Sequence, residues 1–461
     1  MKTTGIPHIT NKVSGEYMKQ TIVLSLLAGM LACAQAQAQS EQPPSDELDG
    51  VISAGKPLSG SEARAASSQA KPQPGSATYT YLRCYYRKSP AANQPQTDYV
   101  WATDPSSGDY YRVNGYWWSG SFVALKNMFY SDTSQDTLRS VCQQTLAKQG
   151  VNRPLALFAA ANNVMSYNHT IWTLDSASQG NAINRMVVFG DSLSDTQNMY
   201  GASQWRLPVA SSWYVGRFSN GRVWVEHLAD QLKLPFYNWA IGGSAADSHL
   251  VVPGLLQQVD SWTQYMQKAP GYRPENTLFT MLIGGNDLLN YGRAVDQVIA
   301  DQGKALDKVI AAGGRNIVVL TLPDLSRTPS GSAGGKAAQL SQQVKDYNAK
   351  LATLVANLKQ KHGAALKLSL FDAYAMFNDL LTNPAKYQVS NTTQPCLNVA
   401  ANASLPYISS QTPRPECTNA DAYVFWDNLH PTTHTHVLLG QMVADFLRQQ
   451  NLNLSAQARR R

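Results

Sequence analysis

Three residues in this chain have the types and order that nucleophilic catalysis requires. Ser192 lies in the segment GDSLSD, immediately after the apolar run Met186–Phe189. Near the other end of the chain, Asp427 precedes His430 by three residues in the segment FWDNLHP. That spacing lets a carboxylate hold one imidazole nitrogen while the other nitrogen accepts the serine proton. These residues therefore predict a nucleophile, a general base and an orienting acid.

Two further segments contain groups that can stabilise negative charge. Gly242 and Gly243 lie in the segment NWAIGGSA, and Asn286 lies in the segment GGND. Glycine lets backbone N–H groups approach a ligand closely, and an asparagine amide is a neutral donor. We expect Ser192 to begin a helix after its strand, so that its own N–H also faces a developing oxyanion. Asp195 is expected to have a structural role there.

A metal site is the competing interpretation of the histidines near the C-terminus. His430, His434 and His436 follow one another closely. However, Pro431 interrupts the series, and no second group of ligands at metal-binding spacing occurs elsewhere in the sequence. We therefore predict no metal site, and serine-based chemistry requires no metal or organic cofactor.

The elements that position these residues are predicted from continuous apolar runs that alternate with helical segments. The expected strands are Met186–Phe189, Leu234–Tyr237, Leu278–Ile283, Asn316–Leu320 and Leu366–Phe371, and helices are expected near 222–232, 290–313, 337–361 and 434–449. Such alternation is typical of a parallel sheet sandwiched by helices, with ligands beyond the carboxyl ends of its strands. The sequence thus predicts an α/β domain over residues 183–450.

A different composition marks residues 79–178, where tyrosine and tryptophan crowd together. Turn signals at Asp104-Pro105, Ser107-Gly108 and Asn114-Gly115 separate short aromatic and β-branched runs. The Asn-Gly pair predicts a two-residue hairpin. We expect a small β-rich domain with one helix near 134–149. Its rings either form the core of that domain, which we favour, or bind sugars or a membrane interface.

The ends of the chain have compositions typical of export and flexibility. Residues 1–38 contain an apolar stretch followed by small residues, which predicts a secretory signal after a start region. Residues 39–78 are rich in Ser, Ala, Pro, Gly and Gln and are expected to form a flexible leader. Residues 451–461 form a basic tail. The expected location is therefore extracellular or periplasmic.

Charge and cysteine content narrow the possible partners. The net charge is +7, and Arg459, Arg460 and Arg461 supply three of these charges, so the sequence gives no basic face for nucleic acid. No partner protein is implied. After export four cysteines remain, and their even number in an oxidising compartment favours disulfides. The sequence-local pairing joins Cys84 to Cys142 and Cys396 to Cys417.

Taken together, the segments FGDSLSD, NWAIGGSA, IGGND and DNLHP resemble the GDSL or SGNH family of esterases and lipases. The resemblance implies a flavodoxin-like fold, with Ser192 as nucleophile and His430 and Asp427 completing a triad. It also implies an oxyanion hole formed by Ser192, Gly243 and Asn286, where Gly242 is the alternative to Gly243.

The N-terminal segment YTYLRCYYRKS extends this resemblance to secreted bacterial lecithin-dependent haemolysins, and the catalytic half is similar to glycerophospholipid–cholesterol acyltransferases. Both imply hydrolysis of phospholipid esters at a membrane or lipid aggregate, with an alcohol such as cholesterol as an alternative acyl acceptor. A carbohydrate acetyl esterase and a non-enzymatic adhesin with an inert hydrolase scaffold remain as alternatives.

Overall fold

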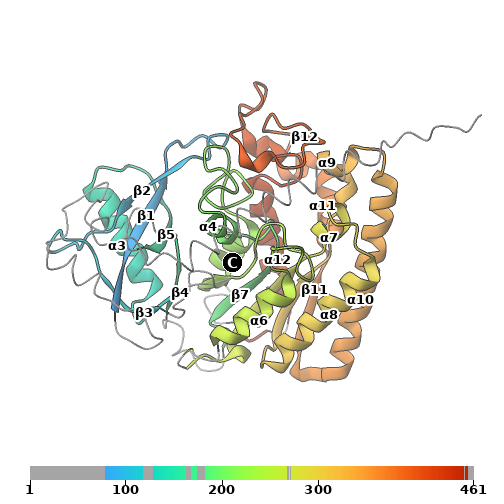
Figure 1. The fold of residues 1–461 in the computed structure, drawn as a ribbon, viewed down its shortest axis with the longest axis horizontal. Coiled ribbons are helices and arrows are strands. Elements are labelled where there is room, and N and C mark those ends of the chain that lie inside the picture. Colours follow the sequence, from blue (N-terminus) through green and yellow to red (C-terminus); the bar gives the residue numbers. More distant parts are fainter. Residues whose placement is uncertain are drawn as a thin grey trace, which may run out of the picture.

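The computed structural model describes residues 78–117, 128–161, 168–173, 182–266, 269, 271–450 and 452–454. The predicted signal segment, the leader before Thr78 and most of the basic tail lie outside these residues. The described chain forms two regions, a smaller β-rich region and a larger α/β region (Figure 1). Of the helices in the described ranges, none is long and apolar enough to cross a membrane.

The larger region is built on a parallel five-stranded sheet. Its strands run in the order β11-β10-β9-β7-β8. Their bounds are β7 (Arg185–Gly190), β8 (Phe236–Asn238), β9 (Thr277–Leu282), β10 (Asn316–Leu320) and β11 (Lys367–Phe371). In chain order this is the 2-1-3-4-5 arrangement of flavodoxin-like sheets. The predicted fold class is therefore confirmed, and each predicted strand lies within two residues of the observed one.

Helices cover both faces of this sheet (Figure 1). The helices α6, α8 and α10 pack together on one face, and α5 packs with α12 on the other. The helices of this region are α4 (Asn198–Ala202), α5 (Trp224–Leu232), α6 (Leu255–Met266), α7 (Gly285–Leu289), α8 (Val295–Ala311), α9 (Pro329–Ser332), α10 (Ala337–His362), α11 (Ala373–Thr382) and α12 (Thr433–Gln449). Outside the main sheet, β12 (Asn391–Pro395) pairs with β13 (Tyr423–Phe425).

The smaller region is a mainly antiparallel sheet with one helix across it. Strands run in the order β2-β1-β3-β4-β6, and β5 also pairs with β1. The elements are β1 (Thr78–Arg87), β2 (Thr97–Trp101), β3 (Val113–Trp117), β4 (Met128–Ser131), α3 (Gln135–Lys148), β5 (Leu155–Ala161) and β6 (Thr170–Thr173). Apolar side chains from the strands and α3 form its core, which favours the core interpretation of the aromatic residues.

The predicted hairpin at Asn114-Gly115 is wrong, because both residues lie inside β3. Gly115 faces the backbone of β4, and a Cβ there would lie 1.8 Å from the carbonyl oxygen of Tyr130. Close approach of two strands, rather than turn geometry, therefore requires this glycine. The turn at Asp104–Gly108 does form, with the N–H of Gly108 donating to the carbonyl of Asp104 at 2.9 Å.

Buried contacts join the two regions. Arg83 of β1 is fully buried, and its guanidinium lies 5.0 Å from the ring centre of Trp101 and 4.8 Å from that of Trp205 in the larger region. Nearby, Asn220 accepts a hydrogen bond from Arg87 through its carbonyl and donates one to the carbonyl of Ala92. Cation–π and hydrogen-bond contacts of this kind fix the regions against each other.

Two disulfides join the four described cysteines. Cys84 of β1 is bonded to Cys142 of α3, and Cys396 to Cys417 near the C-terminus. This is the sequence-local pairing expected above. The second bond joins cysteines 21 positions apart, and the segment between them includes Tyr407, whose ring contacts the site described below.

Candidate active site

Ser192 lies directly beyond the carboxyl end of β7, in a tight turn. The turn is closed by the N–H groups of Ser194 and Asp195, which both donate to the carbonyl of Asp191. The expectation that Ser192 begins a helix is wrong, since α4 starts only at Asn198. Without a helix on this turn there is no macrodipole to exploit, so stabilisation of negative charge depends on individual N–H groups.

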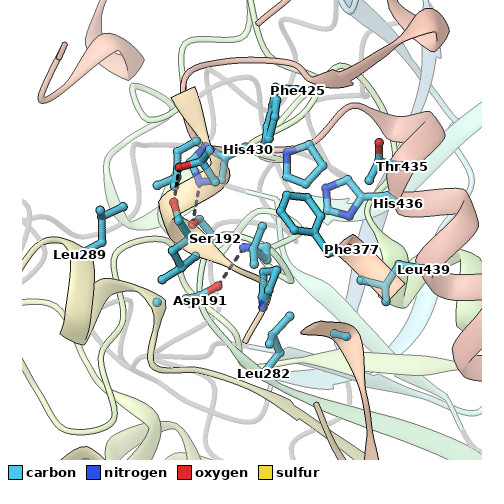
Figure 2. Close-up of a pocket in the computed structure, with 18 of the residues that line it drawn as sticks. Asp191, Ser192, Leu282, Leu289, Phe377, Phe425, His430, Thr435, His436 and Leu439 are labelled. Atoms are coloured by element: carbon cyan, nitrogen blue, oxygen red, sulfur yellow. Dashed lines mark hydrogen bonds between the residues drawn. The ribbon is translucent and has the colours of Figure 1, made fainter. Parts of the chain in front are cut away.

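The side chain of Ser192 is hydrogen-bonded to His430. The Oγ of Ser192 and the Nε2 of His430 are 2.8 Å apart (Figure 2). On the other side of the imidazole, Nδ1 of His430 lies 3.0 Å from Oδ2 of Asp427. All three side chains are buried. Asp427 and His430 follow β13, so residues 238 positions apart in the sequence meet beyond the carboxyl end of β7. The structure thus brings the three predicted triad residues together in the predicted order.

Asp427 is surrounded by donors. Besides His430, its carboxylate accepts the backbone N–H groups of Leu429 and His430 at 2.8 Å and the indole N–H of Trp213 at 2.9 Å. Burial raises the pKa of Asp427, but His430 and the backbone N–H groups of His430 and Leu429 outweigh burial, and the net shift is downward. Asp427 is therefore held as a carboxylate, which is the form that orients the imidazole.

Three aromatic residues that were not predicted from the sequence contact this pair. Trp213 donates to Asp427, and the hydroxyl of Tyr407 lies 3.4 Å from Nδ1 of His430. Phe218 and Tyr407 both pack on the imidazole ring, with ring centres 5.1 and 5.4 Å away. Trp213 and Phe218 come from irregular segments and Tyr407 from a three-residue 3₁₀ helix, so no periodic pattern in the sequence indicates them.

The hydrogen bonds distinguish Gly242 from Gly243. The N–H of Gly242 donates to the buried carboxylate of Asp195 at 2.8 Å, which also accepts three N–H groups at the start of α4. The N–H groups of Gly243 and Ser192 have no acceptor within the described ranges. Gly243 has φ of +80°, a conformation that suits glycine. The geometry therefore favours Gly243 over Gly242 as an oxyanion donor.

Asn286 lies in the first turn of α7, directly after β9. Its amide donates one hydrogen to the carbonyl of Ser244 at 2.9 Å, and its carbonyl oxygen accepts from Asn290. The second amide hydrogen has no acceptor among the residues the structure describes. These two hydrogen bonds fix the orientation of the Asn286 side chain, and its second amide hydrogen is left to donate to a substrate oxygen.

Gln258 of α6 forms hydrogen bonds both to Gly190, which precedes the Ser192 turn, and to Ser244, which follows Gly243. Its amide donates to the carbonyl of Gly190 at 2.8 Å and to the hydroxyl of Ser244 at 3.0 Å, and its oxygen accepts the N–H of Gly190. The side chain is fully buried. It was not predicted, because the helix that carries it was not predicted either.

A second buried carboxyl group lies beside the nucleophile. The carboxyl group of Asp191 accepts a hydrogen bond from the N–H of Leu193 at 3.0 Å, and Asp287 lies near it. Burial raises the pKa of Asp191 to about 7; the N–H of Leu193 and His430 oppose this shift, and Asp287 adds to it. Asp287 has its own partners, the N–H of Ala246 and the guanidinium of Arg293.

An apolar pocket opens beside Ser192 (Figure 2). Ser192 and His430 lie on one side of it, and Phe377, His436 and Leu439 lie on the other. The lining side chains are mostly hydrophobic and include Leu282, Leu289, Met376, Phe377, Phe425 and Leu439. A pocket of this kind suits an acyl chain attached to the carbonyl that Ser192 would attack.

The other histidines near the C-terminus have separate partners. His434 bonds the carbonyl of Tyr387 at 2.8 Å, and Nδ1 of His436 accepts the N–H of Trp224 at 3.2 Å. Burial lowers the pKa of His436 to about 3. Within the described parts of the chain, no three His, Cys, Asp or Glu side chains converge as a metal site.

Two family models match separate parts of the chain. Residues 186–443 match the model described as GDSL-like Lipase/Acylhydrolase, which covers the sheet and all of the site above. The chain belongs to this family. Residues 52–174 match the model described as Vibrio dual lipase/transferase, N-terminal domain. The GDSL domain therefore follows a second region with its own family model.

Named relatives agree with this assignment. The thermolabile hemolysin of Vibrio parahaemolyticus is 39% identical over 443 residues, which is 95% of this chain and 99% of that protein. The phosphatidylcholine-sterol acyltransferase of Aeromonas hydrophila is 29% identical over 327 residues, which is 60% of this chain and 94% of that protein. As a GDSL acylhydrolase, the chain is a carboxylic ester hydrolase.

Proposed function

We propose that the chain hydrolyses acyl ester bonds of glycerophospholipids outside the cell, with Ser192, His430 and Asp427 as its catalytic triad. The observation that carries the proposal is the hydrogen-bonded series from Ser192 through His430 to Asp427 at the mouth of an apolar pocket. The relatives named above, a hemolysin and a phosphatidylcholine-sterol acyltransferase, support a lipid substrate.

The hydrogen bonds assign a role to each group. His430 accepts the proton of Ser192 Oγ as that oxygen bonds to the acyl carbon. The carbonyl oxygen then becomes an oxyanion, which the N–H groups of Ser192 and Gly243 and the amide of Asn286 stabilise. His430 returns the proton to the departing lipid oxygen, and Asp427 stabilises the imidazolium meanwhile.

Water completes the cycle by the reverse sequence. His430 removes its proton as it attacks the acyl-enzyme, and fatty acid leaves with Ser192 restored. An alcohol such as a sterol in place of water gives acyl transfer with the same proton movements. The pocket beside Ser192 holds the acyl chain in both steps, so the choice of acceptor depends on the open side of the site.

The proposal extends to the ends of the chain and to its domains. Residues 1–38 are a start region and signal peptide, residues 39–78 a leader, and residues 451–461 a basic tail. Residues 79–178 and 183–450 are the two domains. Disulfides at Cys84–Cys142 and Cys396–Cys417 support an oxidising location. The substrate surface is a phospholipid membrane or lipid aggregate.

Fatty-acid release from phosphatidylcholine vesicles tests the function. The purified protein should release fatty acid, and Ser192→Ala should reduce release by about 10⁵-fold or more. Ser390→Ala, at an exposed serine, is the matched control and should retain full activity. Release that persists in Ser192→Ala would refute the nucleophile. Activity restricted to acetylated glycans would favour the carbohydrate esterase.

A further inference from the structure

Leu250 is an unusual residue for its position, because its apolar side chain is exposed to water and its backbone has a left-handed conformation. His249 and Val252 exchange two backbone hydrogen bonds, of 3.1 and 3.0 Å, so Leu250 and Val251 form the tip of a two-residue turn. Leu250 has φ of +53° and is 61% exposed. Tight turns of this kind favour Gly, Asn or Asp, and the left-handed conformation costs other residues about 1–2 kcal/mol. Folding therefore gives no reason for leucine here.

Ile408 is a second exposed apolar residue, in another segment of the chain. It ends the short 3₁₀ helix Pro406–Ile408 and is 55% exposed. Its neighbour Tyr407 points inward and contacts Phe218 and His430. Among the described residues, Leu250 and Ile408 are the large hydrophobic side chains with more than half of their surface exposed.

One apolar cluster connects both residues to the active site. Val252, which closes the Leu250 turn, packs with Phe218 and Ile241, and Tyr407 packs against the same cluster. His249 stacks on Tyr291 with ring centres 3.7 Å apart, and the Tyr291 hydroxyl donates to the carbonyl of Gly243 at 2.7 Å. Leu250 thus follows His249, which is linked through Tyr291 to Gly243. Ile408 follows Tyr407, whose ring contacts His430.

An exposed cation adjoins the same apolar cluster in sequence. Arg206 precedes Leu207, a further member of the cluster, and its guanidinium forms no ion pair within the described segments. Guanidinium groups bind phosphate through paired N–H donors. Exposed apolar side chains and an exposed guanidinium, all next in sequence to, or in the same turn as, members of one apolar cluster, match the chemistry of a phospholipid surface, where acyl chains lie below a layer of phosphates.

The exposed area separates this partner from a protein. A stable protein complex buries roughly 800 Å² on each side, which two side chains cannot supply. Insertion into lipid has no such threshold, because each side chain gains about 25 cal/mol for every Å² removed from water. We propose that Leu250 and Ile408 insert into aggregated phospholipid and hold the Ser192 site against it. This inference rests on the proposed function and names its docking surface.

Vesicle binding in the Ser192→Ala background tests the docking surface without consuming the lipid. Phosphatidylcholine vesicles are sedimented with the protein, and the bound fraction gives a partition constant. Leu250→Asn and Ile408→Ser should each weaken partitioning about tenfold, and the double variant about a hundredfold. Unchanged partitioning in the double variant would overturn the proposal, whether or not the protein hydrolyses lipid.

Leu250→Asn also separates docking from folding. Asparagine tolerates positive φ, so this variant should unfold at the same temperature as its parent or a higher one while binding vesicles less. Gln388→Asn is the matched control, since Gln388 is exposed with φ of +58° on another part of the surface, and it should bind normally. A lower unfolding temperature in Leu250→Asn would contradict the argument from the turn.

Enzyme activity on dispersed and aggregated substrates provides a second comparison. With Ser192 intact, the double variant should keep the parental kcat/KM on monomeric p-nitrophenyl butyrate and lose about tenfold or more on vesicles. Equal loss on both substrates would overturn the proposal in favour of a role in site geometry. A concentration-dependent dimer that the variants abolish would instead identify a second copy as the occupant. If the parental protein hydrolyses only the soluble ester, the proposed function fails while the binding assay still decides the docking surface.

Discussion

The two segments that meet at the active site each bury a carboxyl group, and the pKa values of the two groups shift in opposite directions. Asp427, on the histidine side, accepts hydrogen bonds from Trp213 and two backbone N–H groups, and its pKa falls. Burial raises the pKa of Asp191, on the serine side, to about 7, and the nearby Asp287 adds to this shift. At Asp427 the neighbouring His430 and the backbone donors outweigh burial, whereas at Asp191 burial outweighs the groups that oppose it. His430 is thereby paired with one firmly ionised carboxylate.

Removing the charge on the histidine side should have the largest effect. Asp427→Asn keeps the size of the side chain but cannot stabilise the imidazolium, and its amide favours the wrong tautomer of His430. We expect kcat to fall by about 10⁴-fold with little change in KM. Steady-state kinetics on a soluble ester measures this, with circular dichroism to verify the fold. A loss below tenfold would show that another group orients His430.

Removing a donor on the serine side should have the next largest effect. Asn286→Ala deletes an amide that faces the developing oxyanion, while Ser192 and Gly243 still donate. The expected loss in kcat is about 10²–10³-fold. Asn290→Ala, which removes only the partner of the Asn286 oxygen, is a suitable control and should lose far less. Full turnover in Asn286→Ala would remove this residue from the oxyanion hole.

Removing one of the hydrogen-bond donors around Asp427 tests how far these donors keep its carboxyl group ionised. Trp213→Phe preserves the ring but removes the N–H that lies 2.9 Å from the carboxylate. A hydrogen bond to a charged group contributes about 1.5–3 kcal/mol, so kcat should fall about tenfold. The pKa of Asp427 should rise, and the acidic limb of the pH–rate profile should move to higher pH. An unchanged profile would mean that the backbone donors suffice.

The smallest effect on catalysis is expected at Asp191, where stability is the better readout. Its pKa is higher in the folded state than in the unfolded state, so the folded protein retains this proton between about pH 4 and pH 7. Stability therefore falls as pH rises through this window and levels off above it. Asp191→Asn should remove this slope and gain about 2 kcal/mol relative to the parent between pH 5 and pH 7.5.

Urea unfolding at the two pH values measures this difference. Asp260→Asn, at an exposed carboxylate, controls for the loss of one acidic residue. An equal stability difference at both pH values would show that Asp191 is ionised in the folded protein. That result would remove the contrast with Asp427.

Sequence patterns predicted the sheet and the order of the site residues, because both depend on local signals. The run Asn316–Leu320 is continuously apolar since helices cover both of its faces. The short spacing of Asp427 and His430 likewise predicted their hydrogen bond. Helix α6 escaped prediction because buried polar Gln258 lies on its inner face. A buried polar residue that hydrogen-bonds two other segments of the chain interrupts the apolar periodicity by which a helix is predicted.

Contacts between distant segments could not be predicted. Trp213 and Asp427 are 214 residues apart, and nothing in either segment indicates the other. The error at Gly115 has the same origin, since the constraint on that glycine comes from the backbone of another strand. The exposure of Leu250 also depends on how its turn lies against the rest of the molecule. The sequence of a segment thus predicts its own secondary structure and short-range hydrogen bonds, whereas its contacts with distant segments depend on the whole fold.

The contacts of Asn220 bear on how this protein can be divided. Its carbonyl accepts from Arg87, its amide donates to Ala92, and its side-chain oxygen accepts the N–H of Thr433, three residues beyond His430. Removing the N-terminal region would leave this buried residue unpaired on one side and expose the ring of Trp205 to water. The catalytic region is thus not an interchangeable module, and a version that begins at residue 183 would lose these contacts.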